Sequence, residues 1–94
     1  MNDEFEWDPV KAAANYRKHG VRFEHAQEAC EDVFALVELD DSEDYGEDRY
    51  AIIGMAEGRL LYVAYAIRGE VIRIISARLA EPRDRRRYHE ENET

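Results

Sequence analysis

The spacing of apolar residues along the chain follows two periods, one typical of strands and one typical of helices. Alternation of apolar and polar side chains predicts a short strand at 5–7. Longer runs rich in β-branched and aromatic residues predict four more strands, at 34–39, 49–55, 60–67 and 71–77. Short glycine-containing segments separate the last three strands and predict hairpin turns. The second half of the chain is therefore expected to form an antiparallel meander.

Two helices are predicted between the first two strands. Asp8 can cap the free amide groups of a helix that begins at Pro9, and Gly20 can adopt the left-handed conformation that ends this helix after His19. Helical spacing then resumes over 23–30. The residues expected to face inward from these helices are Val10, Ala13, Ala14, Phe23, Ala26, Ala29, Cys30 and Val33.

A third helix is predicted from about 81 to 91, starting near Glu81-Pro82. The resulting order of elements predicts an α+β fold in which helices lie on an antiparallel sheet. Ninety-four residues suffice for one core, so residues 1–94 are expected to form a single domain. The lone Cys30 excludes an intramolecular disulfide, and no apolar run reaches the roughly 18 residues of a membrane span. A cytoplasmic protein without membrane contact is expected.

Charge is divided unevenly along the chain, whose formal net charge is -9. Residues 1–48 hold 15 acids and 4 bases, a net of -11, whereas residues 49–94 hold 7 acids and 9 arginines, a net of +2. The acidic average argues against nucleic acid, but the asymmetry favours an interaction surface built from the second half. It makes direct DNA binding through the first two helices a poor hypothesis.

The acidic run 40–48 partly resembles a calcium-binding loop. Asp40, Ser42 and Asp44 have the alternate spacing of EF-hand ligands. However, glycine stands at the seventh position instead of the sixth, and the twelfth is Ala51 where a glutamate belongs. A solvated loop is the better interpretation, with contact to a basic partner segment as its functional alternative. No other cluster has metal-ligand spacing, so neither a metal nor another cofactor is expected.

Two arginines accompany the last predicted strand, one within it and one directly after it. Because side chains alternate along a strand, Arg73 and Arg78 are expected on opposite faces. An arginine inside an apolar strand is costly to desolvate unless an anion pairs with it. Arg49 and Arg68 lie at strand ends, so guanidinium groups are expected to converge there, where their planar donors suit a phosphate. The alternative is internal pairing with carboxylates, and charge alone does not decide between the two.

The predicted terminal helix is rich in arginine but has almost no apolar stripe besides Tyr88. Arg83 has no acidic residue four positions away and is a candidate for contact with RNA. The other arginines are partly explained by surface salt bridges at helical spacing, namely Glu81–Arg85, Arg86–Glu90 and Arg87–Glu91. Such a helix is either marginal or completed by a partner.

The first helix carries three polar residues on one face, Lys11, Asn15 and Lys18, and closes with His19. A histidine at a helix C-terminus interacts well with the helix dipole, so capping is the more frequent role and proton transfer is the alternative. His25 falls on the outer face of the second helix and receives no assignment.

Separated stretches of the chain closely resemble the BrnT toxins of type II toxin–antitoxin systems, and the resemblance spans nearly the whole length. The matching residues are Phe5-Glu-Trp-Asp8, Lys11, Asn15, Lys18-His-Gly-Val21, Phe23-Glu24, Arg49-Tyr50, Gly54, Ile72-Arg-Ile-Ile-Ser-Ala-Arg78 and Tyr88. The resemblance implies a RelE-like fold and a ribonuclease that inhibits translation. It also implies a cognate BrnA-like ribbon-helix-helix antitoxin, through which alone operator DNA is bound. The positions carried over are Lys18, His19, Arg49, Arg68, Arg73, Arg78 and Tyr88.

The chemistry of RNA cleavage assigns roles to these residues. It needs a base for the 2′-OH, cations for the charged phosphorane and an acid for the leaving oxygen. Arg68, Arg73 and Arg78 are assigned to the phosphorane with help from Lys18, which requires no metal, and His19 or Tyr88 is expected to transfer the proton. Arg49 and Arg83 are expected to contact RNA. The alternative is a non-enzymatic binding module, or an inactive toxin homologue, that docks a partner through its arginines and acidic loop.

Overall fold

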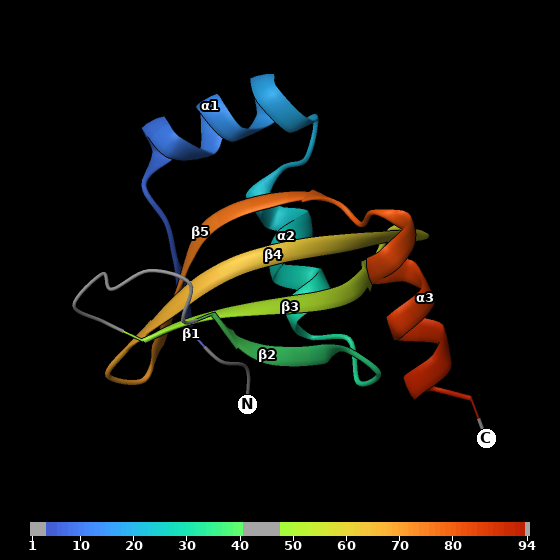
Figure 1. Cartoon of the computed structure of the whole chain (residues 1–94). Helices are drawn as coiled ribbons and strands as arrows, with labels where there is room; N and C mark the ends of the chain where they lie inside the picture. The colour runs from blue at the N-terminus through green and yellow to red at the C-terminus, as the bar shows by residue number, and fades with distance from the viewer. Residues whose placement is uncertain (1–3, 41–47, 94) are drawn as a thin grey trace.

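The computed structural model (Figure 1) describes residues 4–40 and 48–93. In this part of the chain, one five-stranded sheet has the strand order β1-β5-β4-β3-β2. Strands β2 to β5 are antiparallel neighbours, whereas β1 pairs in parallel with the start of β5. The elements in chain order are β1 (Glu4–Glu6), α1 (Pro9–His19), α2 (Phe23–Cys30), β2 (Leu36–Asp40), β3 (Arg49–Ala56), β4 (Arg59–Arg68), β5 (Val71–Leu79) and α3 (Pro82–Glu91).

This arrangement confirms the predicted α+β fold, with its short first strand, two helices, antiparallel meander and terminal helix. Residues 41–47 of the acidic run lie outside the described residues, so their interpretation as a loop stays a prediction. No helix in the described part of the chain has the length and apolar character needed to cross a membrane.

Helix α1 begins and ends at the residues that the sequence indicated. The side chain of Asp8 accepts a hydrogen bond from the backbone N–H of Val10 at 2.8 Å. At the other end, Gly20 has φ of 70° and its N–H donates to the carbonyl of Tyr16 at 2.8 Å. Glycine adopts this left-handed conformation without steric cost, so it turns the chain sharply toward α2.

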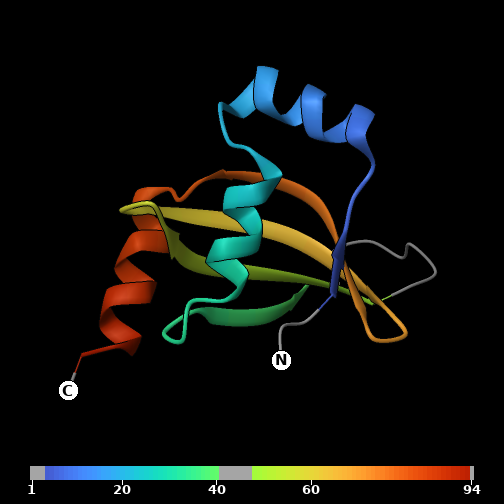
Figure 2. The ribbon, with the colours of Figure 1, turned by 180° about the vertical axis from the view of Figure 1, so that it is seen from behind.

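The main core lies between α2 and one face of the sheet, as Figure 2 shows from behind. Phe23, Ala26 and Ala29 point from α2 onto β3, β4 and β5 and are almost fully buried. The helix approaches the sheet closely at Gly54, where an added Cβ would collide with the carbonyl oxygen of Ala29. Gly54 therefore sets the distance between α2 and β3.

A smaller apolar cluster lies on the opposite face, under α3. Tyr88 packs there against Ile53 and Leu60. Helix α3 covers only the end of this face, beside β3 (Figure 1). Helix α3 leaves the rest of this sheet face uncovered, and polar side chains of β3, β4 and β5 lie there.

Three predictions from the sequence are wrong: two concern burial, and one concerns the residue at which a strand begins. Val10 is 75 % exposed, and Ala13 and Ala14 are exposed too, because α1 docks at the sheet edge through Asn15 instead of an apolar stripe. Val33 is 88 % exposed because α2 ends at Cys30 and helical spacing no longer applies. Strand β2 starts at Leu36 rather than at 34, because the side chain of Asp32 accepts from the N–H of Phe34 and holds the chain in a turn.

Candidate functional site

Asn15 attaches α1 to the open part of the β5 edge. Its side-chain nitrogen donates to the carbonyls of Ala77 (2.9 Å) and Val21 (3.1 Å), and its oxygen accepts from the N–H of Ala77 at 3.1 Å. Strand β1 pairs only with Val71–Arg73, so the amide of Asn15 replaces a neighbouring strand farther along β5. These bonds fix the side of α1 that faces the sheet.

A groove of about 270 Å³ lies between α1 and β5. Lys11, Lys18 and His19 line it from the helix, and Ile75 and Ser76 line it from the strand. The structure thus brings His19 together with the predicted polar face of α1. None of the residues that line the groove is acidic, so the groove suits an anion.

Arg73 and Arg78 lie on the same face of β5, which corrects the prediction of opposite faces. Ser76 pairs with Ala64 and Ile74 pairs with Tyr65, so Ile75 is an extra residue, a β-bulge. The bulge shifts the alternation of side chains by one position between the two arginines. Their partners on β4, Ala66 and Tyr62, are an even number of residues apart and share the face opposite α2.

Both strand arginines are ion-paired in the free protein. Arg73 donates to Glu6 on β1 at 2.8 Å, and the two side chains are 28 % and 41 % exposed. Internal pairing, the simpler of the two sequence interpretations, is therefore present. Because neither side chain is buried, an anionic ligand can still reach the remaining donors of the guanidinium.

Arg78 is held more firmly, at the end of the face beside α3. It donates to Asp84 at 3.1 Å and to the carbonyl of Leu79 at 3.0 Å. Its guanidinium also stacks over the ring of Tyr62, 4.1 Å from the centroid. Asp84 is 6 % exposed, so this carboxylate needs the arginine as its counterion. No spacing identified in the sequence indicates this pair.

Two further strand arginines, Arg49 and Arg68, lie on the same face as Arg73. Arg49 pairs across β3 and β4 with Ala66, which in turn pairs with Arg73, so the three positions form one row. Arg68 lies two residues beyond Ala66 on β4 and is exposed. The predicted convergence therefore holds for the positions of Arg49, Arg68 and Arg73, whereas Arg78 is roughly 13 Å farther along the strand.

Tyr88 is held in the smaller apolar cluster under α3. It is 7 % exposed, and its hydroxyl donates to Asp32 at 2.7 Å. Burial, together with this hydrogen bond, raises the pKa of Tyr88 to about 12. Burial alone would raise the pKa of Asp32, but hydrogen bonds from Phe34, Tyr88 and Met55 lower it instead.

The other arginines of α3 differ in their surroundings. Arg83 is exposed in the first turn of the helix. Arg87, predicted to pair with Glu91, contacts Glu38 on β2 with both terminal nitrogens, at 2.8 and 3.4 Å. Side-chain hydrogen bonding and charge from Glu38 raise the pKa of Arg87. This long-range pair holds α3 against the sheet, and no local spacing in the sequence indicates it.

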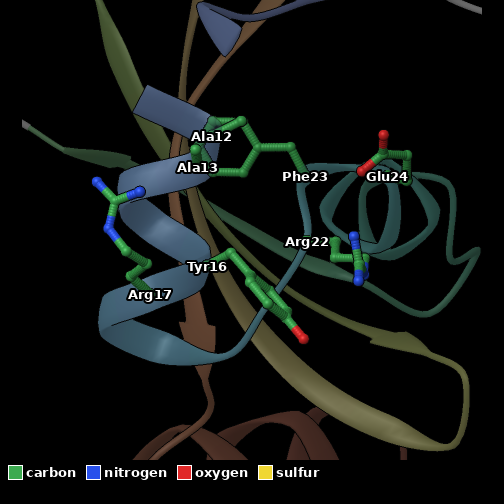
Figure 3. A pocket seen from close by; sticks show the side chains of 7 residues that line it. All are labelled: Ala12, Ala13, Tyr16, Arg17, Arg22, Phe23 and Glu24. Carbon is green, nitrogen blue, oxygen red and sulfur yellow. The ribbon is translucent and has the colours of Figure 1, made fainter. Parts of the chain in front are cut away.

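A second hollow lies on the other flank of α1, between that helix and the start of α2 (Figure 3). It has a volume of about 340 Å³. The guanidinium of Arg22 lies 4.5 Å from the ring centroid of Tyr16 there, and Arg17 and Glu24 complete the polar lining. No pattern in the sequence indicates this hollow.

A comparison with protein families agrees with the resemblance seen in the sequence. The family model described as "Ribonuclease toxin, BrnT, of type II toxin-antitoxin system" matches residues 7–84. The match runs from Trp7 before α1 to Asp84 in α3 and so includes the groove and the strand arginines. No curated protein matches the chain.

Proposed function

Because the chain belongs to the BrnT family of ribonuclease toxins from type II toxin–antitoxin systems, we propose that it is a metal-independent endoribonuclease that inhibits translation in the cytoplasm. A cognate BrnA-like ribbon-helix-helix antitoxin neutralises it, and operator DNA is bound only through that antitoxin. The substrate is RNA.

The observation that carries this proposal is the continuity between the cationic groove and the arginine face. Ser76 lines the groove beside Lys18 and His19 and also shares its face with Arg73. A phosphate placed over β5 therefore has basic groups on two sides, from α1 and from the sheet. Cations arranged before the reaction stabilise charge that develops on the phosphorane.

In the proposed reaction the 2′-oxygen of a ribose attacks the adjacent phosphorus, and the 5′-oxygen of the next nucleotide leaves. The imidazole of His19 takes the proton of the 2′-OH or, as imidazolium, supplies the proton of the leaving 5′-oxygen, and solvent water completes the other proton transfer. Arg73, with Arg68 and Lys18, neutralises the charged phosphorane. The products end in a 2′,3′-cyclic phosphate and a 5′-OH. Tyr88 is assigned a supporting role, because its proton is held by Asp32.

Arg78 and the two RNA-binding candidates are given more distant roles. Arg78 lies beside α3 and is assigned to a phosphate farther along the strand of RNA. Arg49 shares the row of Arg73 and is assigned to the neighbouring phosphate on the sheet. Arg83 is exposed on α3 and extends the same path.

The proposal is tested by incubating the purified chain with RNA in excess EDTA, alone and with translating ribosomes. Shortened RNA with cyclic phosphate ends is expected in at least one setting, because the internal 2′-OH needs no metal-activated water. Cleavage that disappears with EDTA and returns with a divalent cation would show that the metal-independent mechanism is wrong.

A non-enzymatic binding module is the second candidate. The ion pairs of Arg73 with Glu6 and of Arg78 with Asp84 favour it, because these arginines already have carboxylate partners in the free chain. On this view the arginine face docks an acidic segment of another protein. Intact RNA in both settings of the same experiment, together with tight binding to a partner, would favour the module.

A further inference from the structure

The edge of the sheet farthest from the proposed site carries an apolar surface. Val33 and Phe34 in the turn before β2, and Val37 and Leu39 within it, are 88 %, 59 %, 56 % and 57 % exposed. We call these four residues the β2 patch. Single exposed apolar residues are common, but several large ones on one short segment mark a surface that binds another molecule.

The β2 patch is an uncovered continuation of the main core. Val37 and Leu39 pair with Ile52 and Tyr50 on β3, so they share the face on which α2 packs. Helix α2 lies over β3, β4 and β5 and ends at Cys30, so β2 is left outside its cover (Figure 2). The opposite face of β2 is occupied, since Leu36 packs beside Ile53.

Strand β2 is also an edge strand with only part of the usual protection, since it is short and its Glu38 is engaged by Arg87 of α3. It is the outermost strand in the sheet order, and in the described part of the chain no segment pairs with its free side. Its sequence, Leu36-Val-Glu-Leu-Asp40, contains no lysine or proline, and its register with β3 runs without a bulge. Natural edge strands are commonly blunted by these features, and an edge that lacks them can accept an added strand.

Charge decides between the two possible occupants of this edge. A second copy of the chain would bring another net charge of -9 to it, and residues 1–48, which include the patch, hold 15 acids and 4 bases. Like charges oppose such a pairing, whereas a basic segment is attracted. Glu31, which is exposed and lies two residues before Val33, adds to this preference.

We propose that a segment of the antitoxin adds to β2 as an extra strand, with alternating apolar side chains over Val37 and Leu39 and with Lys or Arg residues beside them. The identity of this partner rests on the proposed function. Strands β3 and β4 separate β2 from β5, so the antitoxin can hold the toxin without occupying the groove between α1 and β5. The part of the antitoxin outside this added strand then blocks the activity of the toxin.

The test uses a double variant, Val37→Lys with Leu39→Lys, and a matched control, Val10→Lys, on α1. All three side chains are more than half exposed, so each variant should fold. The probe is a purified BrnA-like ribbon-helix-helix antitoxin, the partner of the proposed function. The double variant should keep its RNA cleavage and growth inhibition, but its Kd for the probe should rise about tenfold or more. The control should bind the probe like the wild type.

Hydrogen exchange supplies a second readout on the wild-type complex. Binding of the probe should slow exchange at amides of β2, because strand addition gives them new carbonyl partners. An unchanged Kd in the double variant, or unchanged exchange in β2, would overturn the inference. So would a dimer of the chain alone that the double variant dissociates. Absence of RNA cleavage in the wild type would overturn the proposed activity instead. The binding result would still show whether the probe binds at β2.

Discussion

At the scale of single residues, Arg73 has two anionic partners. They are Glu6 in the free protein and an RNA phosphate in the proposed complex. A partly exposed ion pair contributes about 0–1 kcal/mol, so a phosphate can compete with Glu6 for the guanidinium. The pair also restricts the arginine to one orientation, and this lowers the entropy lost when RNA binds. Pairing with a carboxylate and a role in binding are therefore compatible.

Replacing Arg73 with alanine should lower the rate of RNA cleavage about 100-fold, because one cation is removed from the developing phosphorane charge. Growth inhibition should fall with it. The urea midpoint should stay close to that of the wild type, since the lost pair is partly exposed.

Arg59→Ala is the matched control, because Arg59 is an exposed arginine at the start of β4, away from Arg68 and Arg73. Full cleavage by Arg73→Ala, or an equal loss in Arg59→Ala, would remove Arg73 from the mechanism.

At the scale of elements, α3 is attached by polar contacts more than by apolar burial. Tyr88 bonds to Asp32, and Arg87 bonds to Glu38. Asp32 also accepts from the backbone N–H of Met55 at 2.8 Å, so one carboxylate joins the turn before β2, the end of β3 and α3. A helix with so few apolar residues depends on such anchors.

The anchor at Tyr88 predicts a loss of stability at alkaline pH. Its pKa is raised from 10.0 to about 12 in the folded chain, so the neutral hydroxyl is favoured by folding. The stabilisation is complete below pH 10 and is lost as the pH rises toward 12. The wild type should exceed Tyr88→Phe by about 1 kcal/mol in unfolding free energy at pH 8.

That difference should shrink above pH 10 and then change sign, as measured by urea unfolding across the range. Tyr65, whose pKa burial also raises to about 12, is present in both proteins and cancels in the comparison. A constant difference from pH 8 to 12 would show that Tyr88 does not hold α3 through its proton.

The elements that the sequence predicted well are those with local signals. Asp8 and Gly20 set the ends of α1, and short turns containing Gly58 and Gly69 set the hairpins. The bulge at Ile75 has no local signal, because it depends on how β5 pairs with β4. Since one extra residue moves every later side chain to the other face, this single event changed the relation of Arg73 to Arg78.

For the candidate site, the sequence likewise predicted some of the residues but not how they are arranged in space. Lys18 and His19 were identified by their positions on α1, and the groove beside β5 joins them to Ser76. The role of Asn15 could not be predicted, because its partner Ala77 lies 62 residues away in the chain. Polar contacts between distant segments leave no periodic pattern in the sequence.

At the scale of the whole molecule, the fold interleaves the acidic and arginine-rich halves. Strands β3, β4 and β5, which carry the arginines, occupy the centre of the sheet, and β1 and β2 from the acidic half form its two edges. The proposed RNA substrate would therefore meet a basic strip between acidic borders. On this proposal the borders repel a strand of RNA that lies off the strip, so the charge pattern would orient the RNA as well as bind it.

This pattern predicts how RNA binding depends on salt. For single strands, each neutralised phosphate contributes about -0.7 to the slope of log K against log salt concentration. Because the protein has a net charge of -9, RNA phosphates should contact only the few basic side chains of the strip. Few phosphates are then neutralised, so the slope should be shallow. Arg73→Ala should make the slope shallower still by about 0.7, and Arg59→Ala should leave it unchanged.

The measurement is a binding titration with 2′-O-methyl RNA, which cannot be cleaved because the attacking hydroxyl is blocked. Salt is varied between roughly 50 and 200 mM, where the Debye length falls to about 10 Å or less and the acidic borders are screened before the direct contacts. Equal slopes for the wild type and Arg73→Ala would mean that Arg73 stays with Glu6 when RNA binds. In that case the phosphate contacts would have to come from α1 and the other arginines of the sheet.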